Sequence, residues 1–134
     1  MINVVTADDH ELIRFGLRKT IEKTSDIRVA AEASDGHQLL GQLKKATCDV
    51  ILLDISMPGV DIFDLIREIQ IISPKKPILI LTMHPESQYA MRLMKAGISG
   101  YLKKSCPYSV IIDAIRQVHA GKKYITQEVA EKLS

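Results

Sequence analysis

The sequence predicts an α/β fold in which five strands form a doubly wound parallel sheet. Apolar runs alternate along the chain with segments whose apolar residues recur at helical spacing. The runs at residues 2–7, 49–53 and 78–81 are apolar at nearly every position, which is typical of strands covered on both faces. Because strands joined by intervening helices pair in parallel, this alternation predicts helices on both faces of one sheet.

Turn residues mark where most of the strands begin and end. Asp35-Gly36 follows the second strand, Pro58-Gly59 follows the third, and Pro77 precedes the fourth, and each of these is a turn signal. The fifth strand is short. The strands are therefore expected at residues 2–7, 27–33, 49–53, 78–81 and 99–103.

Apolar residues three and four apart define the helices, such as Leu39, Leu40 and Leu43 in the second. Asp61 is an expected N-cap of the third helix, because its carboxylate can accept from the first free backbone amides. The helices are expected at residues 11–23, from the Asp35-Gly36 turn to about 45, from 62 to the loop at Pro74, from about 85 to 97, and from about 107 to 121. A short extra C-terminal helix is expected from Thr126 onward.

Composition restricts the class of protein. The chain has 134 residues, so one domain is expected, and 46% hydrophobic residues argue against disorder. The formal net charge of +2 does not call for a nucleic-acid surface. Cys48 and Cys106 lack metal-site spacing and indicate reduced thiols in a cytoplasmic protein. No apolar stretch has the length of a membrane span, so no membrane partner is expected.

Asp54 is the most informative residue because it lies where a buried strand reaches the surface. A carboxylate in that position is costly without a partner. Polar residues that follow other strands supply candidates, namely Asp8 and Asp9, Thr82 and Lys104. Ligands of open parallel sheets bind beyond the carboxyl ends of the strands. The side chains are therefore expected to meet if the strand order is 2-1-3-4-5.

In that order, three carboxylates converge and repel one another unless a cation joins them. Mg²⁺ suits hard oxygen ligands at a shallow, partly hydrated site. Asp54 can then act as a nucleophile in phosphoryl transfer, with Lys104 stabilising charge on the phosphoryl oxygens and the Thr82 hydroxyl donating to one of them. The product, an acyl phosphate, is labile, so the modified state resets itself.

Simpler interpretations exist for each residue taken alone. Asp8 and Asp9 could form a helix cap and a solvated turn, Thr82 could be an ordinary strand residue, and Lys104 could be a surface charge, as Lys103 is expected to be. The histidines show no ligand spacing and indicate structural or solvent-facing roles. They are found at positions 10, 37, 84 and 119.

Taken together and in this order, the motifs are specific. They are Ala7-Asp8-Asp9-His10, Leu53-Asp54 with the following Ser56-Met57-Pro58-Gly59, Leu81-Thr82, and Gly100-Tyr101-Leu102-Lys103-Lys104. With them the chain resembles the receiver domain of two-component response regulators, which has a CheY-like, flavodoxin-like fold. Residues 83–84, 95–97 and 120–125 further resemble the NarL/LuxR subfamily.

The resemblance implies roles for the acidic residues. Asp54 is the phosphoacceptor, charged by a sensor histidine kinase. Asp9 is a direct Mg²⁺ ligand together with Asp54, Asp8 acts mostly through water, and the backbone carbonyl of Ser56 completes the metal site.

The resemblance also implies a switch. Lys104 pairs with the phosphoryl group, and Thr82 and Tyr101 form the switch pair, in which Thr82 turns toward the phosphoryl group and the Tyr101 ring moves inward. Ser105 stands where the family often has proline, which leaves open whether the preceding peptide bond is cis.

The implied organisation is a receiver domain at residues 1–121 and a linker with a short helix at 122–134, leading toward a helix-turn-helix DNA-binding domain that this chain lacks. The expected function is a phosphorylation-dependent switch that controls transcription through that domain, with homodimerisation on phosphorylation. The domain is then no enzyme beyond its own phosphorylation and dephosphorylation. A phosphohydrolase is the alternative, but residues 54–56 lack the Asp-x-Asp spacing of that class. A binding domain with a silent pocket is the other alternative.

Overall fold

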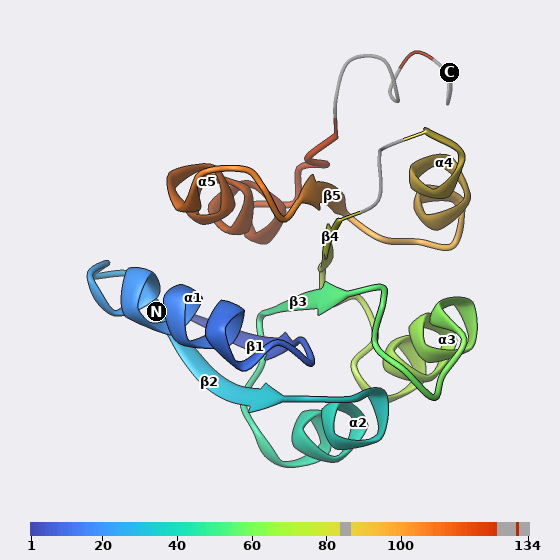
Figure 1. The fold of residues 1–134 in the computed structure, drawn as a ribbon, viewed down its shortest axis with the longest axis horizontal. Coiled ribbons are helices and arrows are strands. Elements are labelled where there is room, and N and C mark those ends of the chain that lie inside the picture. The colour runs from blue at the N-terminus through green and yellow to red at the C-terminus, as the bar shows by residue number, and fades with distance from the viewer. Residues whose placement is uncertain (84–86, 126–130, 132–134) are drawn as a thin grey trace.

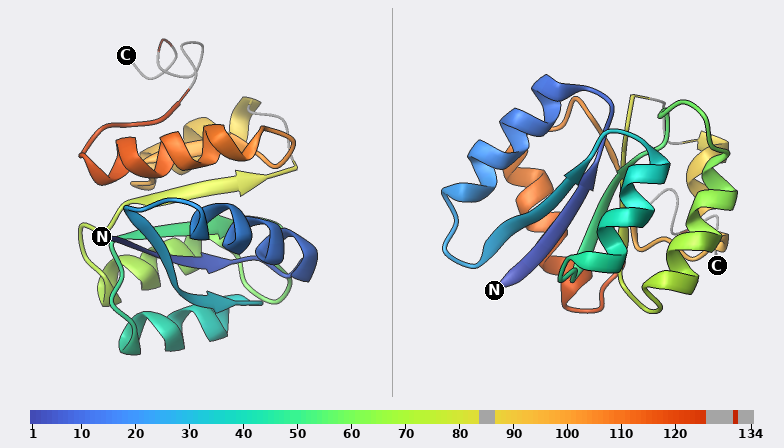
Figure 2. Two further views of the ribbon diagram at one scale, coloured as in Figure 1. Left: turned by 90° about the vertical axis from the view of Figure 1, so that its left-hand side faces the viewer. Right: turned by 90° about the horizontal axis from the view of Figure 1, so that it is seen from below.

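Five parallel strands form one sheet in the order β2-β1-β3-β4-β5, as the sequence predicts. The computed structural model describes residues 1–83, 87–125 and 131. All strands point the same way, so their carboxyl ends share one edge of the sheet (Figures 1 and 2). The strands are β1 (Ile2–Ala7), β2 (Ile27–Ala33), β3 (Val50–Asp54), β4 (Ile78–Thr82) and β5 (Gly100–Lys103).

Helices cover both faces of the sheet and bury two separate cores. α1 and α5 lie on one face, and α2, α3 and α4 lie on the other (Figure 1). Alternate residues of β3 point to opposite faces, so Ile51 and Leu53 join one core while Val50 and Leu52 join the other. The helices are α1 (Glu11–Glu22), α2 (Gly36–Lys45), α3 (Ile62–Ile72), α4 (Ser87–Lys95) and α5 (Tyr108–His119).

Local hydrogen bonds explain where several elements begin. The Asp61 carboxylate accepts from the first free amides of α3, which confirms the expected N-cap, and Asp35 does the same for α2 through the Gln38 amide. The third strand was expected from Asp49 but begins at Val50. The Asp49 carboxylate instead accepts from the backbone and side chain of Asn3, and these bonds lower the pKa of Asp49.

Some predicted features lie outside the described residues. These are the expected start of the fourth helix near 85–86, His84, and the short C-terminal helix except for Glu131. Within the described part of the chain no helix is both long and apolar enough to cross a membrane. No cis peptide bond occurs there either, so the Lys104–Ser105 bond is trans.

The segment after α5 pairs with the sheet, which the sequence does not announce. Tyr124 forms a parallel bridge with Gly100, donating from its amide to Ser99 O at 2.9 Å and accepting from the Tyr101 amide at 3.1 Å. A β-carbon at Gly100 would lie 2.9 Å from the Tyr124 carbonyl oxygen and 2.7 Å from Leu79 Cδ1. Glycine is therefore required where this backbone approaches.

Both cysteines are free thiols, as predicted. Cys48 is buried in the core between the sheet and α2, at 8% exposure, and burial raises the pKa of its thiol to about 11. Cys106 is half-buried, and burial raises its pKa as well. Both groups are therefore protonated near neutral pH.

Candidate functional site

Asp54 is the last residue of β3 and is 1% exposed. Its Oδ1 accepts two hydrogen bonds from Ser56, from the amide at 3.1 Å and from the hydroxyl at 2.8 Å. Its Oδ2 makes no hydrogen bond to the described residues, but the Lys104 Nζ lies 3.2 Å away. Contact with the ammonium lowers the cost of burying this charge, and Oδ2 keeps lone pairs that no donor occupies.

Lys104 follows β5 and reaches two carboxylates. Its backbone amide donates to the carbonyl of Thr82 at 2.7 Å, which fixes the residue beside the end of β4. Its ammonium lies 3.0 Å from Asp8 Oδ2, in addition to the contact with Asp54. The side chain is only 2% exposed. Lys104 is thus a buried cation between two buried acids, whereas Lys103 is exposed.

The first two acidic residues lie in the turn after β1. Asp8 is 3% exposed, and its carboxylate Oδ1 accepts from the His10 amide at 2.8 Å. The Arg14 guanidinium donates to the Asp8 carbonyl oxygen, which ties this turn to α1. Asp9 is more exposed and faces the same centre.

His10 belongs to the site, although its sequence context indicated a structural or solvent-facing role. Its Nδ1 lies 2.8 Å from Asp8 Oδ1, 3.2 Å from Asp9 Oδ1 and 2.9 Å from Lys104 Nζ. The side chain is 53% exposed, so solvent reaches one side of the ring. The available signal was adjacency, because His10 directly follows two acidic residues at the end of a strand.

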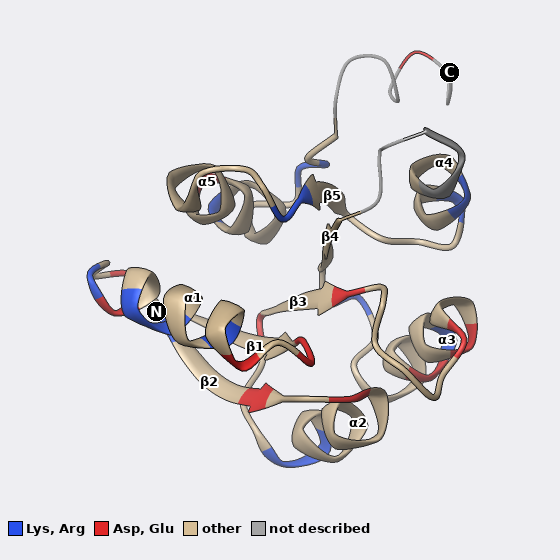
Figure 3. Ribbon diagram, viewed as in Figure 1, with Lys and Arg blue, Asp and Glu red and all other residues tan. Residues whose placement is uncertain are grey.

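Four side chains therefore gather at the carboxyl edge of the sheet, with one ligand atom of each within 4.8 Å of the others. They are Asp8, Asp9, His10 and Asp54. Figure 3 shows acidic residues in the turn after β1 and at the tip of β3. The carboxylate oxygens and the buried Asp54 Oδ2 fit a divalent cation that prefers oxygen ligands.

The two residues of the predicted switch pair are buried. Thr82 ends β4 at 0% exposure and pairs in register with Lys103. Tyr101, in β5, is 2% exposed and packs in the core beneath α3 and α4. The Tyr101 ring therefore occupies an inward position in this structure.

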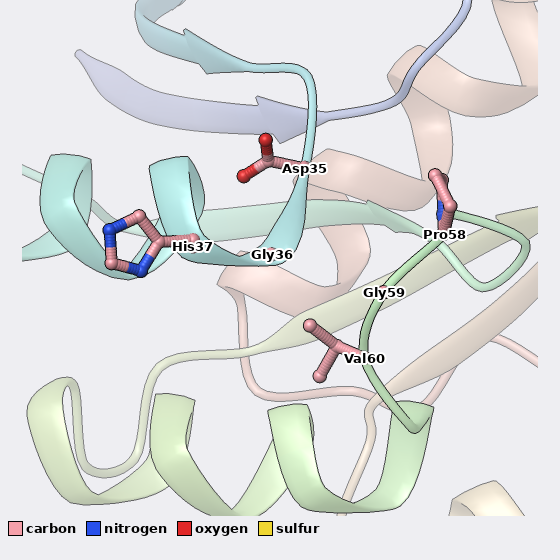
Figure 4. Close-up of a pocket in the computed structure, with 6 residues that line it drawn as sticks. All are labelled: Asp35, Gly36, His37, Pro58, Gly59 and Val60. Carbon is pink, nitrogen blue, oxygen red and sulfur yellow. The ribbon is translucent and has the colours of Figure 1, made fainter.

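A separate pocket of about 370 Å³ lies between the loop after β2 and the loop after β3 (Figure 4). None of the predicted site residues lines it. The lining residues are Asp35, Gly36, His37, Pro58, Gly59 and Val60. The gathered carboxylates thus lie at an edge of the sheet rather than in this pocket.

This sheet order, with acids and a lysine at one edge, defines a CheY-like receiver. The sequence profile described as "Response regulator receiver domain" matches residues 4–116. The chain belongs to the family of response regulator receiver domains. Its relatives place it in the NarL/LuxR subfamily, which confirms the expectation from the motifs.

Curated relatives match along the whole chain. The response regulator UvrY of Escherichia coli (strain K12) is 37% identical over 134 residues, and the response regulator GacA of Pseudomonas aeruginosa is 32% identical over 134 residues. The chain spans 62% of the length of the former and 63% of the latter.

Solved structures of receiver domains agree with the fold. The isolated receiver domain of RcsB from Salmonella enterica serovar Typhimurium, determined with the phosphomimetic BeF₃⁻, is 30% identical with a TM-score of 0.86, over 99% of each chain. The non-phosphorylated receiver domain of RcsB from Escherichia coli is 30% identical with a TM-score of 0.87, over 94% of this chain and 98% of that one.

Proposed function

We propose that this domain is a signalling switch that accepts a phosphoryl group on Asp54 from a sensor histidine kinase. The observation that carries the proposal is the buried Asp54 carboxylate, with Oδ2 3.2 Å from the Lys104 ammonium and within reach of Asp8 and Asp9. A buried acid with a fixed cation and an available oxygen is suited to nucleophilic attack. Membership of the receiver family supports the same role.

In the proposed reaction, a carboxylate oxygen of Asp54 forms a bond to phosphorus while the bond from phosphorus to the imidazole nitrogen of the kinase histidine breaks. The leaving imidazole takes the electron pair of that bond. Ser56 orients the Asp54 carboxylate through its two hydrogen bonds to Oδ1, which leaves Oδ2 available. The Lys104 ammonium balances charge that gathers on the phosphoryl oxygens.

The acidic residues fit Mg²⁺, which we propose as the cofactor. Asp9 and Asp54 would hold it directly, Asp8 through water, and the Ser56 backbone carbonyl would add a further oxygen. When bound, Mg²⁺ would neutralise negative charge shared by the carboxylates and the incoming phosphate. The contacts of Lys104 support a requirement for this additional positive charge, because its one ammonium group faces both Asp8 and Asp54.

We propose Thr82 and Tyr101 as the switch pair. The Lys104 amide donates to the Thr82 carbonyl, so the two residues that would contact the phosphoryl group are linked through the backbone. A Thr82 hydroxyl drawn toward that group favours one of two arrangements of β4 and β5 that already exist. The inward Tyr101 ring corresponds to one of them.

The proposal extends to the rest of the pathway. Residues 1–121 act as the receiver and 122–134 as a linker toward a DNA-binding output, with homodimerisation after phosphorylation. The relatives named as response regulators support regulation of an output rather than metabolic catalysis. The cytoplasmic location expected from the sequence stays a prediction.

Phosphorylation with a small phosphodonor tests the proposal. With MgCl₂ and acetyl phosphate, intact-mass spectrometry should show one added phosphate, which neutral hydroxylamine removes. Asp54→Asn should show none, while Asp64→Asn, a change on the exposed surface of α3, should behave like the wild type. Absence of any adduct in the wild type at saturating donor, or an adduct that persists in Asp54→Asn, would overturn the assignment.

A further inference from the structure

The His10 ring points into the acidic site although half of its surface is exposed. Nδ1 lies 2.8 Å from Asp8 Oδ1 and 3.2 Å from Asp9 Oδ1, and a ring nitrogen of His10 lies within 4.8 Å of a carboxylate oxygen of Asp54. Roles assigned so far in this site use only oxygen ligands and Lys104. The imidazole nitrogen is therefore a potential donor atom that the proposed phosphorylation chemistry leaves unused.

These separations match the spacing of neighbouring ligands around one metal ion. For octahedral coordination with bonds of about 2.1 Å, adjacent ligand atoms lie about 3.0 Å apart. The two distances from His10 Nδ1 to the aspartate oxygens fall on either side of that value. Asp9 is the proposed direct ligand, and its Oδ1 lies 3.2 Å from Nδ1, so an ion held by Asp9 is within reach of Nδ1.

The contact with Lys104 shows that His10 Nδ1 can face a positively charged group. An ammonium group has only protons to donate, so when Lys104 Nζ, 2.9 Å away, bonds to Nδ1, the ring presents a lone pair. When Nδ1 accepts from Lys104, it carries no proton to donate to Asp8 Oδ1, so the hydrogen bonds to Lys104 and to Asp8 are alternatives. In the first of them, the lone pair of His10 is directed at a cation in the site.

We propose that His10 is a nitrogen ligand of the divalent cation and makes the site prefer transition metals over Mg²⁺. The inference rests on the proposed cation-dependent switch and adds its metal preference. Imidazole nitrogen binds Ni²⁺, Co²⁺ and Zn²⁺ well, whereas Mg²⁺ favours oxygen and water. His10 thus adds binding free energy for transition metals and almost none for Mg²⁺.

Calorimetric titration of the full chain with NiCl₂ and with MgCl₂ tests this preference. His10→Ala and His10→Phe remove the donor, and the second keeps a ring of similar size. The matched control is His37→Ala, because His37 is exposed and lies outside the acidic group. Loss of an outer-shell partner typically lowers metal affinity by about 10-fold to 100-fold, and loss of a direct ligand should cost at least as much.

The expected result is a fall in Ni²⁺ affinity of about tenfold or more in both His10 variants, with Mg²⁺ affinity within about twofold of the wild type. His37→Ala should match the wild type for both ions. In nitrogen-15 NMR spectra, ZnCl₂ should shift the His10 Nδ1 resonance and MgCl₂ should not. Mg²⁺-dependent phosphorylation of Asp54 in the wild type and in His37→Ala, measured alongside, separates failure of this inference from failure of the proposed function.

Three results would overturn the inference. Equal Ni²⁺ affinity in the wild type and the His10 variants shows that His10 only bonds to Asp8, and Mg²⁺-dependent phosphorylation of the wild type then leaves the proposed function standing. An equal loss of affinity for both ions assigns His10 to positioning the carboxylates. Failure of the wild type to bind either ion removes both the inference and the cation requirement of the proposed function.

Discussion

Replacing Lys104 by methionine tests whether the buried ammonium holds the acidic site together. The ammonium lies 3.0 Å from Asp8 Oδ2 and 3.2 Å from Asp54 Oδ2, and all three side chains are at most 4% exposed. Each pair is worth about 5 kcal/mol of attraction at an effective dielectric constant of about 20. Desolvation of the charges offsets most of this, and removing one partner of a buried pair costs about 3–5 kcal/mol.

We therefore expect Lys104→Met to lower the free energy of unfolding by about 3–5 kcal/mol, measured by urea unfolding followed by circular dichroism. Lys103→Met, a change of the exposed neighbour, should stay within about 0.5 kcal/mol of the wild type. Added MgCl₂ should reduce the difference in unfolding free energy between Lys104→Met and the wild type. A loss below about 1 kcal/mol, or one no larger than that of Lys103→Met, would refute the reasoning.

Three further predictions concern stability. Gly100→Ala should destabilise the fold by about 1–3 kcal/mol, because the added carbon meets the Tyr124 carbonyl oxygen. The control Gly41→Ala, in α2 with open space around it, should be neutral or stabilising. Thermal unfolding of both variants measures the difference. The neutral Cys48 thiol contributes stability that is complete below pH 9 and is lost as pH rises through the folded pKa of about 11. The loss amounts to about 2–3 kcal/mol of unfolding free energy. Urea unfolding at several pH values should show this decline in the wild type, and the same decline in Cys48→Ala would contradict the prediction. Asp61→Ala should cost about 1 kcal/mol through loss of the α3 cap, and an unchanged urea midpoint would count against the cap.

Much of the fold follows from the sequence because the spacing of the apolar residues and the positions of the turn residues indicate the same strands and helices. β1 and β2 have the expected ends, and the Asp61 cap is as expected, since an aspartate directly before an apolar helical face has few other uses. β3 differs by one residue at each end. The Asp49 carboxylate accepts a hydrogen bond from the backbone amide of Asn3 in the neighbouring strand. These residues are 46 positions apart, so no local sequence pattern predicts their contact.

The candidate site was predictable in its main part for a topological reason. Parallel strands bring their carboxyl ends to one edge, so Asp8, Asp54 and Lys104 meet without any local signal between them. The His10 contacts and the hydroxyl of Ser56 were missed, because side-chain direction in a turn depends on backbone angles that residue spacing does not encode. The Tyr124 bridge was missed because its single bridge leaves no repeating pattern.

The return of the chain to β5 also has a mechanical consequence. α5 is tied to this strand at both ends, by the Cys106 amide bonded to the Lys103 carbonyl at its start and by the Tyr124 bridge after its end. Lys123 adds a third tie through its ammonium, 3.1 Å from the carbonyl of Ile98. β5 and the segments before and after α5 are thus joined by hydrogen bonds, so a shift of the backbone around Tyr101 would act on α5 from both of its ends.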